Sequence, residues 1–490
     1  MNWQAVYPEI VLLAMACVVA LVDLWKPGPG RIVTYCLTQL SLLVVAGLQL
    51  SFFVDGFTLY SMQRMVVADP MGHLLGLFAT LAMMVTLVYA RPYAASRDML
   101  KGELFSLSMF SLLGILVMVA ANNFLVVYLG LELMSLSLYA LVAMRRDDIG
   151  ATEAAMKYFV LGALASGFLL YGLSMMYGAT GSLGIPEVFK AIAGGRINRA
   201  VLILGTVFVV SGLAFKLGAV PFHMWVPDVY QGAPTAATLL VGGAPKLAAF
   251  AITIRLLVEG MSGLALDWQQ MLILISVGSM LIGNLAAIAQ TNLKRMLAYS
   301  TIAQVGFMLL GFCPGVVGGN TNSAVNAYSS AMFYIVVDVL TSLGTFGMIM
   351  LLSRAGHEAE RIDDFRGLAR RSPWFAGVMA VFMFSLAGIP PTVGFYAKLA
   401  VLQSLVSTNV GGYIWLAVAA VVLSLLGAYY YLRVVKVMYF DEPIDTHPVE
   451  GGTDVRIVMS LNGAAVLLLG ILPGGLMQLC AQAIVRMFAT

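Results

Sequence analysis

The chain has 490 residues, of which 61% are hydrophobic and only 10% are charged. Roughly a quarter of the residues of a water-soluble protein are charged, so this composition excludes an ordinary soluble globular protein. The net charge of +3 is small and gives no indication of nucleic-acid binding.

Apolar segments of about 20 residues recur from end to end, and their period is helical, which predicts transmembrane helices and not an outer-membrane β-barrel. The first segment, MNWQAVYPEI, has no basic region before it, so we expect a retained helix and not a cleaved signal peptide. The predicted fold class is an all-α polytopic membrane protein with about fourteen transmembrane helices. In chain order they are 5–25, 32–54, 66–90, 104–121, 124–144, 153–178, 200–226, 235–258, 268–289, 297–318, 324–353, 373–404, 411–439 and 456–486.

Basic residues are divided unequally between the predicted loops. Loops after odd-numbered helices, with the helix ends beside them, hold eighteen Lys and Arg residues, whereas the other side of the membrane holds six. Cytoplasmic loops carry the positive excess in membrane proteins. We therefore expect both termini to face away from the cytoplasm.

Five charged residues lie inside the apolar segments: Glu132, Lys216, Lys246, Asp338 and Lys398. An ionised side chain at the centre of a membrane helix costs about 2.5–3.5 kcal/mol on insertion scales. Five of them together cost on the order of 10 kcal/mol, which is comparable to the net stability of a whole domain. Such a cost indicates that the charges have a use.

Two uses are open. The charges could be structural pins that hold helices together, although a pair with Glu132 would explain one lysine and not three. Alternatively, they could carry protons, because burial disfavours the charged form of a lysine and a nearby carboxylate restores it. Glu132 close to Lys216 would form such a switch, and lysine suits this role better than arginine, which stays protonated.

Prolines interrupt the same segments near the lysines. Pro221 follows Lys216, Pro245 directly precedes Lys246, and Pro390 and Pro391 precede Lys398. A proline inside a helix removes one backbone hydrogen bond, and irregular backbone at membrane depth occurs only where protein or water covers it. We therefore expect a hydrated, polar cavity beside each lysine.

The sequence contains no recognisable motif for binding a metal or a cofactor. The four cysteines and four histidines are dispersed, without the spacing of a zinc, haem or iron–sulfur site. We find no Walker A loop and no strand followed by GxGxxG. The prediction is that the chain binds no metal and no cofactor.

Four stretches carry a resemblance to a known family: GLELMSLSLYAL at 130–141, FKLGAVPFHMWVPDVYQGAPTAAT at 215–238, QTNLKRMLAYSTIAQVGF at 290–307 and SLAGIPPTVGFYAKLAVL at 385–402. In this order they resemble the antiporter-like subunits of respiratory complex I. PDVYQGAP and the lysine in the twelfth segment make the chain most similar to the subunit N family of bacterial NADH-quinone oxidoreductases.

The resemblance implies a fold in which helices 4–8 and 9–13 form an inverted repeat with helices 7 and 12 broken. It divides the chain into three N-terminal helices at 1–103, repeats at 104–260 and 261–440, and a loop with the last helix at 441–490. It also implies a proton path in the plane of the membrane, in which Glu132 controls Lys216, Lys246 is central, and Lys398 lies near the exit.

Two further residues have open roles. His223 either belongs to the path or caps the helix break beside it. Asp338 departs from the pattern of the resembled family, and it either hydrogen-bonds Tyr334 or Ser342, one turn away on its own helix, or extends the chain of titrating groups.

The resemblance implies a translocase subunit in a bacterial inner membrane, with other complex I membrane subunits, including neighbouring antiporter-like ones, as partners. In such a membrane, the orientation predicted from the basic residues places both termini in the periplasm. NADH, FMN, iron–sulfur clusters and quinone are expected in partner subunits. Two alternatives remain: a subunit of a multi-subunit sodium/proton antiporter or membrane-bound hydrogenase, and a structural membrane scaffold.

Overall fold

The computed structural model describes residues 2–26, 28, 30–195, 197–444, 447, 449 and 451–489. Arg196, which belongs to the basic-residue count, and four residues of the loop within 441–490 (445, 446, 448 and 450) lie outside the described residues. The helices are α1 (Tyr7–Trp25), α2 (Ile32–Val54), α3 (Pro70–Ala95), α4 (Gly102–Val119), α5 (Phe124–Val142), α6 (Ile149–Thr180), α7 (Ile185–Ala193), α8 (Arg199–Leu217), α9 (Trp225–Gly232), α10 (Thr235–Gly242), α11 (Pro245–Thr253), α12 (Ala265–Ile288), α13 (Leu293–Leu310), α14 (Ala324–Leu352), α15 (Leu368–Arg371), α16 (Pro373–Ala387), α17 (Val393–Val406), α18 (Gly411–Phe440), α19 (Thr453–Ile471) and α20 (Gly474–Phe488). A π-helical turn, η2 (Ile254–Gly260), extends α11, and two short strands, β1 (Leu59–Ser61) and β2 (Val66–Ala68), form an antiparallel hairpin.

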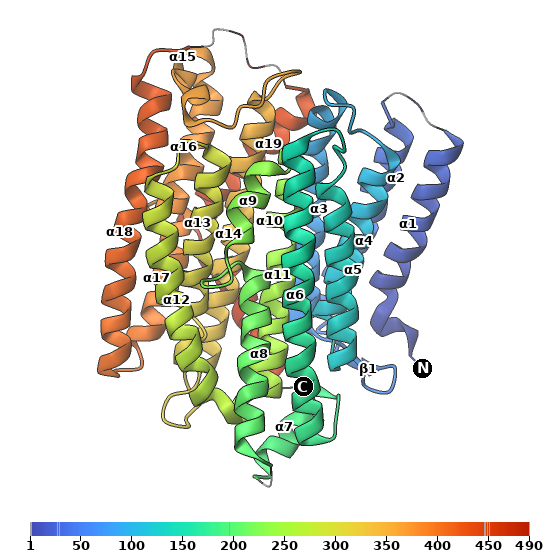
Figure 1. The fold of residues 1–490 in the computed structure, drawn as a ribbon, viewed down its shortest axis with the longest axis vertical. Coiled ribbons are helices and arrows are strands. Elements are labelled where there is room, and N and C mark those ends of the chain that lie inside the picture. Colours follow the sequence, from blue (N-terminus) through green and yellow to red (C-terminus); the bar gives the residue numbers. More distant parts are fainter. Residues whose placement is uncertain are drawn as a thin grey trace.

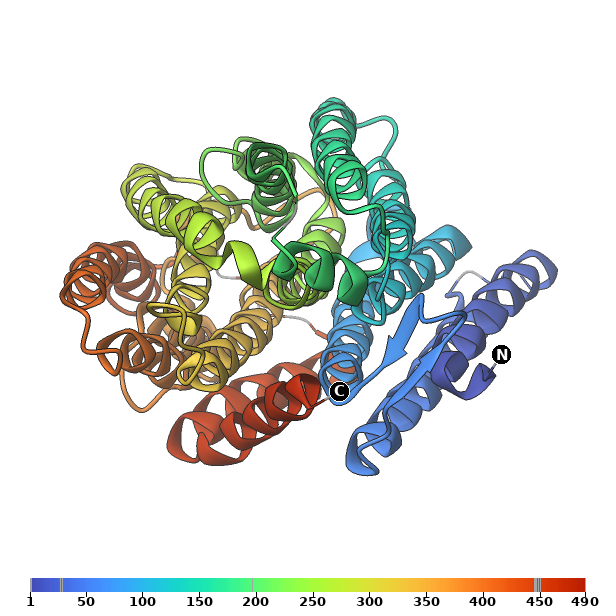
Figure 2. The ribbon, with the colours of Figure 1, turned by 90° about the horizontal axis from the view of Figure 1, so that it is seen from below.

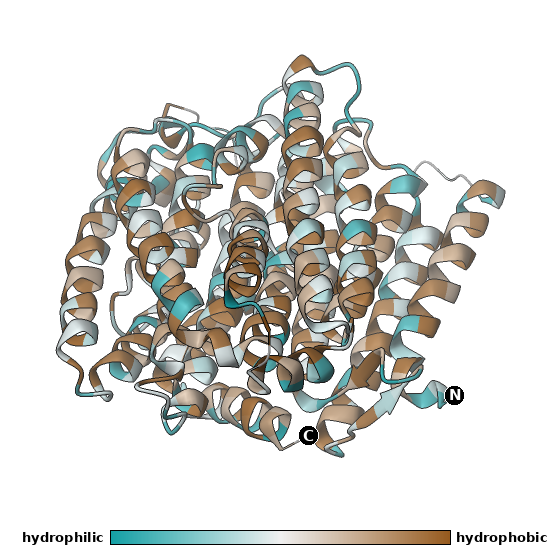
Figure 3. Cartoon of the chain, turned by 60° about the horizontal axis from the view of Figure 1, so that its bottom comes forward, coloured by the Kyte–Doolittle hydropathy of each residue, from teal (hydrophilic) through white to brown (hydrophobic). Residues whose placement is uncertain are grey.

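The helical membrane fold is confirmed. Among the described residues, thirteen helical runs are long and apolar enough to cross a membrane. The shorter apolar helices α16 and α17 follow one another around a break at 388–392, and together they make the fourteenth predicted span. The helices consist mainly of hydrophobic residues, and many of the hydrophilic residues lie in the loops at the two ends of the molecule (Figure 3).

The helices stand roughly side by side, and both chain termini lie toward the same end of the molecule (Figure 1). Seen from that end, α1 and α2 lie at one edge, α18 lies at the opposite edge, and the helices between them form the body (Figure 2). The spans at 235–260, 293–315 and 324–352 are the most enclosed, because at least 94% of the apolar window of each is buried inside the chain. These spans carry Lys246 and Asp338, so both side chains lie far from lipid.

The structure corrects several predicted helix boundaries. The helix expected at 66–90 begins only at Pro70, because residues 66–68 pair with β1 instead. Asp69 caps this helix, accepting a hydrogen bond from the backbone N–H of Gly72 at 2.8 Å. The expected last helix, 456–486, is interrupted before Pro473 and forms α19 and α20. The short helix α7 has no counterpart among the predicted elements.

Three other predicted helices are interrupted where prolines lie. The segment 200–226 is helical only to Leu217, and it resumes as α9 at Trp225. The segment 235–258 is divided between α10 and α11, and the segment 373–404 between α16 and α17. The breaks expected in the seventh and twelfth spans are therefore present, and the eighth span has one as well.

Candidate functional site

The break after α8 exposes backbone groups close to Lys216. Gly218 ends the helix with a left-handed backbone (φ 74°) that glycine adopts at low cost. The carbonyl oxygen of Phe215 accepts a hydrogen bond from the indole N–H of Trp225 at 2.9 Å. Pro221 lies inside the irregular segment 218–224. The sequence thus ends the helix one residue after Lys216 and leaves the ammonium beside non-helical backbone.

Lys216 and Glu132 interact without touching. The ammonium of Lys216 donates a hydrogen bond to the hydroxyl of Ser135 at 2.8 Å, and Ser135 lies one turn after Glu132 on α5. Glu132 is close enough to act on Lys216 electrostatically. Its Oε1 atom is buried and has no hydrogen-bond partner among the described residues. Lys216 therefore has the hydroxyl of Ser135 as its hydrogen-bond partner and no direct hydrogen bond to Glu132 among the described residues.

A cavity connects Lys216 with Lys246. It has a volume of about 20 Å³ and is lined by both lysines, by Pro245 and by Thr301. A cavity of about 10–15 Å³ or more on this measure holds a water molecule when polar groups line it. Lys246 lies in the first turn of α11, directly after the break between α10 and α11. Water in this cavity could hydrogen-bond both ammonium groups.

Lys246 forms a buried ion pair with Asp338. Its Nζ lies 2.7 Å from Oδ2 of Asp338, and the two side chains are 5% and 3% exposed. Of the two alternatives for Asp338, a hydrogen bond to Tyr334 or Ser342 is not found among the described residues: the Tyr334 hydroxyl donates to Gln304 instead, and the Asp338 carboxylate faces α11. Neither charge could be buried alone, because an unpaired ion in a low-dielectric interior is very costly.

Among the described residues, Lys398 has no acidic partner within ion-pair distance. Its ammonium donates hydrogen bonds to the carbonyl oxygens of Leu386 and Ala387, both at 3.0 Å, and to the hydroxyl of Ser424 at 2.8 Å. These carbonyls belong to the last turn of α16, where the helix end carries a partial negative charge. The break at 388–392, which contains Pro390 and Pro391, frees them for this interaction. The carbonyl oxygens at the end of α16 thus stabilise the ammonium of Lys398, as a carboxylate does for Lys246.

A second cavity, of about 10 Å³, lies between Asp338 and Lys398 and is lined by both. Gln304 and Tyr334 line it as well, and the side-chain amide of Gln304 donates to the carbonyl oxygen of Leu386 at 3.0 Å. The polar groups therefore follow one another from Glu132 through Lys216, Lys246 and Asp338 to Lys398.

His223 lies in the irregular segment after α8. Its side chain is 8% exposed, and its Nδ1 atom has no hydrogen-bond partner among the described residues. The ring does not line the cavity between Lys216 and Lys246. This position is close to the break, and its role stays a prediction.

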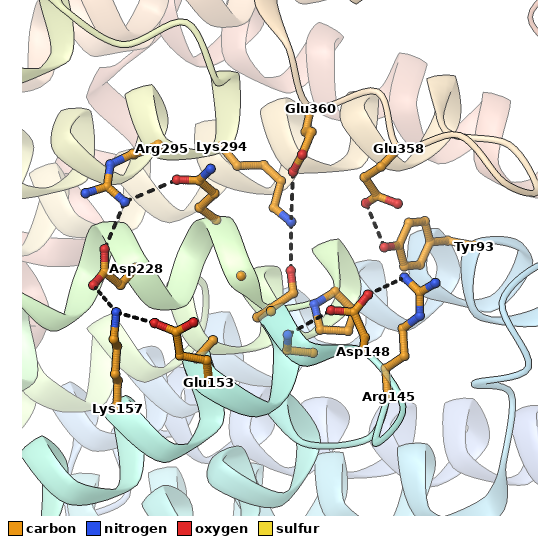
Figure 4. Close-up of a pocket in the computed structure, with 17 residues that line it drawn as sticks. Tyr93, Arg145, Asp148, Glu153, Lys157, Asp228, Lys294, Arg295, Glu358 and Glu360 are labelled. Atoms are coloured by element: carbon orange, nitrogen blue, oxygen red, sulfur yellow. Dashed lines mark hydrogen bonds and ion pairs between the residues drawn. The ribbon is translucent and has the colours of Figure 1, made fainter.

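A wider, charged pocket of about 420 Å³ lies between the end of α3, the start of α6, α9 and the start of α13 (Figure 4). Asp228 lies between two cations, with Lys157 and Arg295 each at 2.8 Å. Glu358 accepts a hydrogen bond from the hydroxyl of Tyr93 at 2.7 Å. Lys294, which is 2% exposed, donates to the carbonyl oxygen of Ala233 at 2.7 Å.

Two acids of this pocket are held in their ionised form. Burial alone would raise the pKa of Asp228, but hydrogen bonds from Lys157 and Arg295 outweigh burial and lower it. Burial likewise opposes ionisation of Glu358, but the charge of Lys294 and a hydrogen bond from Thr235 lower its pKa below the ordinary value. The pocket therefore offers fixed charges at neutral pH.

Comparison with known proteins identifies the family. A family model described as NADH:quinone oxidoreductase/Mrp antiporter, transmembrane, matches residues 121–427. NADH-quinone oxidoreductase subunit N of Polaromonas naphthalenivorans (strain CJ2) is 63% identical over 487 residues, which cover 99% of this chain and 97% of the relative. The chain belongs to the subunit N family of NADH-quinone oxidoreductase.

Solved structures agree with this family. A chain of respiratory complex I from Thermus thermophilus with bound aureothin is 30% identical, has a TM-score of 0.81, and is matched over 99% of its length by 97% of this chain. A chain of the Mrp complex from Dietzia sp. DQ12-45-1b has a TM-score of 0.83 over 99% of this chain and 97% of its own, but only 21% identity. The second likeness shows a shared fold. The family resemblance of the four sequence stretches is confirmed.

Sequence reasoning named the charged members of the subunit N site but missed the neutral ones. Ser135 and Thr301 hydrogen-bond the lysines, and Gln304 lines the cavity beside Lys398. A lone hydroxyl or amide in an apolar segment gives no distinctive pattern. The pairing of Lys246 with Asp338 had one usable signal, since two buried opposite charges lower each other's cost. Among the described residues, no group of three His, Cys, Asp or Glu side chains could hold a metal ion.

Proposed function

We propose that this chain is the membrane subunit N of a bacterial NADH-quinone oxidoreductase and that it translocates protons along Glu132, Lys216, Lys246, Asp338 and Lys398. The observation that carries the proposal is the unbroken succession of these groups through the enclosed interior, with one cavity between Lys216 and Lys246 and another between Asp338 and Lys398. Each gap is bridged by polar side chains or by room for a water molecule.

The first step is a change at Glu132 and Lys216. When Glu132 carries its charge close to Lys216, the ammonium form of the lysine is favoured. When the carboxylate moves away or is neutralised, burial favours the neutral amine and the proton leaves towards the cavity. Ser135, which accepts from the ammonium, holds the lysine in place without a direct hydrogen bond to Glu132.

The central pair receives that proton. Asp338 stabilises the ammonium of Lys246 in the resting arrangement. Lys246 passes its proton to Asp338 and takes up the proton that arrives from Lys216, which neutralises the carboxylate and weakens the ion pair. Once Lys398 has released its own proton, the proton on Asp338 can cross the second cavity to the neutral amine of Lys398. There the carbonyls of Leu386 and Ala387 favour the ammonium form less strongly than a carboxylate would, which eases release.

The other subunits supply the driving force. In this proposal NADH, FMN, iron–sulfur clusters and quinone bind in partner subunits, and electron transfer there reaches this chain through conformational and electrostatic coupling. The partners are other membrane subunits, including neighbouring antiporter-like ones, in the bacterial inner membrane. The two termini face the periplasm, because the loops with the positive excess lie at the other end.

The inverted repeat is also part of the proposal. Helices α4 to η2 (104–260) and α12 to α18 (261–440) would form the two repeats, after the N-terminal helices at 1–103 and before the loop and last helices at 441–490. A helix that ends at a left-handed glycine close to a lysine occurs in each half, at Gly218 and at Gly388, and supports this division.

Lys246→Ala tests the proposal against a structural scaffold. We expect the complete oxidoreductase to assemble with this variant, while proton pumping in closed membrane vesicles, measured per NADH oxidised, is lost. A scaffold would keep both assembly and pumping. Lys26→Ala, which removes an exposed lysine at the end of α1, is the matched control and should pump at the parental rate.

A further inference from the structure

A second polar cluster lies away from the lysines, between the N-terminal helices and η2. Asp69, fully buried, forms an ion pair with Arg255 at 2.8 Å, and Arg255 is itself 1% exposed. Arg255 also binds Glu259, one turn further on, at 3.0 Å. The proton path described above uses none of these residues.

Next to this ion pair, two polar atoms lack partners. His73, on the first turn of α3, is 4% exposed, and its Nδ1 atom shares a hydrogen bond of 2.9 Å with Gln49 on α2. Its Nε2 atom has no hydrogen-bond partner among the described residues. The Oε2 atom of Glu9, on the first turn of α1, is likewise buried and unpartnered in the described part of the chain.

Both side chains line the same cavity. It has a volume of about 10 Å³, and Glu9, Gln49, Asp69 and His73 contribute to its wall. Buried polar groups that find no protein partner are usually satisfied by an internal water with two to four polar neighbours. One water at this position would satisfy Nε2 of His73 and Oε2 of Glu9 together.

A wider vestibule lies next to this cavity. A vestibule of about 700 Å³ lies between α7, the start of α14 and the end of α20, and Arg255 and Glu259 line it. Val67 lines both the vestibule and the small cavity, and the Asp69–Arg255 ion pair lies beside it. The hairpin and α7, which border the vestibule, lie at the end of the molecule that bears the termini (Figure 1).

The charged residues near the cavity favour the binding of a proton, because negative charges outnumber positive ones. Asp69 and Glu259 together carry one negative charge more than Arg255 neutralises, and no other cation lies within ion-pair distance of either acid in the described structure. Arginine stays protonated, so Arg255 lines the vestibule and does not carry the proton itself. A carboxyl group and an imidazole that share one water can hold a proton between them.

We propose that Glu9 and His73 form a second proton-binding site, which holds one water and exchanges its proton with the vestibule on the side of the termini. This inference goes beyond the proposed function, because it requires no transfer along the lysines.

Infrared spectroscopy of the intact, resting complex tests the site. A pH titration of the parental complex should show a carboxyl C=O band of Glu9 that is absent in Glu9→Gln. In His73→Gln the band should appear at a shifted frequency, because the bridging water loses its imidazole partner. Glu103→Gln, which changes an exposed acid on the first turn of α4, should leave the band unchanged.

The shared site would be contradicted if the carboxyl band assigned to Glu9 were still present in Glu9→Gln. It would also be contradicted if that band kept its parental frequency in His73→Gln. Because the measurement involves no turnover, a failure of the proposed pumping function would not affect its outcome.

The exchange route is tested by blocking the vestibule. Thr321 is exposed and lines its wall. In Thr321→Cys, reaction with a bulky thiol reagent should slow the hydrogen–deuterium exchange of the Glu9 carboxyl band several-fold. The same reagent on the complex without this cysteine is the control. Exchange at an unchanged rate in the labelled variant would contradict the route through the vestibule.

Discussion

At the scale of single residues, the arrangement of Glu132, Ser135 and Lys216 determines whether the first lysine keeps its proton. The ammonium already has a hydroxyl partner at 2.8 Å, so the carboxylate is free to act through its charge alone. A charge effect falls off gradually with distance, whereas a hydrogen bond is lost within about 1 Å.

Substitutions at Glu132 should therefore depend on charge more than on length. We expect Glu132→Ala to reduce proton pumping at least about tenfold, and Glu132→Asp, which keeps the carboxylate but retracts it, to reduce it less. Pumping by the reconstituted complex, normalised to assembled protein, measures both. A Glu132→Ala variant that pumps at the parental rate would show that this carboxylate does not control Lys216.

At the scale of helices and strands, the breaks position the lysines, and Gly388 is the clearest example. It ends α16 with φ 84°, and a Cβ atom there would lie 2.8 Å from Cδ and 3.3 Å from Nζ of Lys398. Alanine would therefore strain the backbone and displace the ammonium from the carbonyls of α16.

We expect Gly388→Ala to destabilise the protein by roughly 1–2 kcal/mol, the cost of a left-handed residue with a side chain, and to lower pumping as well. Gly377→Ala, in the first half of α16, is the matched control, because its Cβ would meet nothing closer than 3.9 Å. Thermal unfolding of the purified complex and pumping in vesicles measure the two effects. Equal behaviour of the two variants would contradict the positioning role of the break.

At this scale, the spans and their breaks could be predicted from the sequence, whereas the hairpin and the buried ion pair could not. Long apolar segments and their prolines predicted the spans and the breaks at 218–224 and 388–392, because hydropathy and a missing N–H act locally. The hairpin at 59–68 was missed, since strands of three residues are too short to show a period. The Lys246–Asp338 pair joins residues far apart in the chain, so only the packing of α11 against α14 reveals it.

At the scale of the whole molecule, the charged pocket of Figure 4 is lined by residues from segments that are far apart in the sequence. Asp228 and Glu358 have lowered pKa values there, so their contribution to stability is fully present above their ordinary values of about 4. It is lost as the pH falls further, through the lowered values of the folded state.

Acidification should therefore leave this contribution intact down to about pH 5 and remove it progressively below about pH 4. The double variant Asp228→Asn with Glu358→Gln should be less stable than the parent at pH 7, and the difference should shrink at pH 3. Thermal unfolding of the chain in its complex across this range measures it. A difference that stays constant with pH would show that neither carboxylate is held by its cations.

The proposed function rests on buried lysines that gain and lose protons during turnover, and Lys246→Arg tests this most directly. Arginine keeps a positive charge opposite Asp338 but does not release its proton at any accessible pH. In vesicles that contain the assembled complex with this variant, we expect electron transfer from NADH to be measurable and the protons moved per NADH to fall below the parental value. An unchanged number of protons per NADH would contradict proton transfer through Lys246 and leave the buried charges with a structural role.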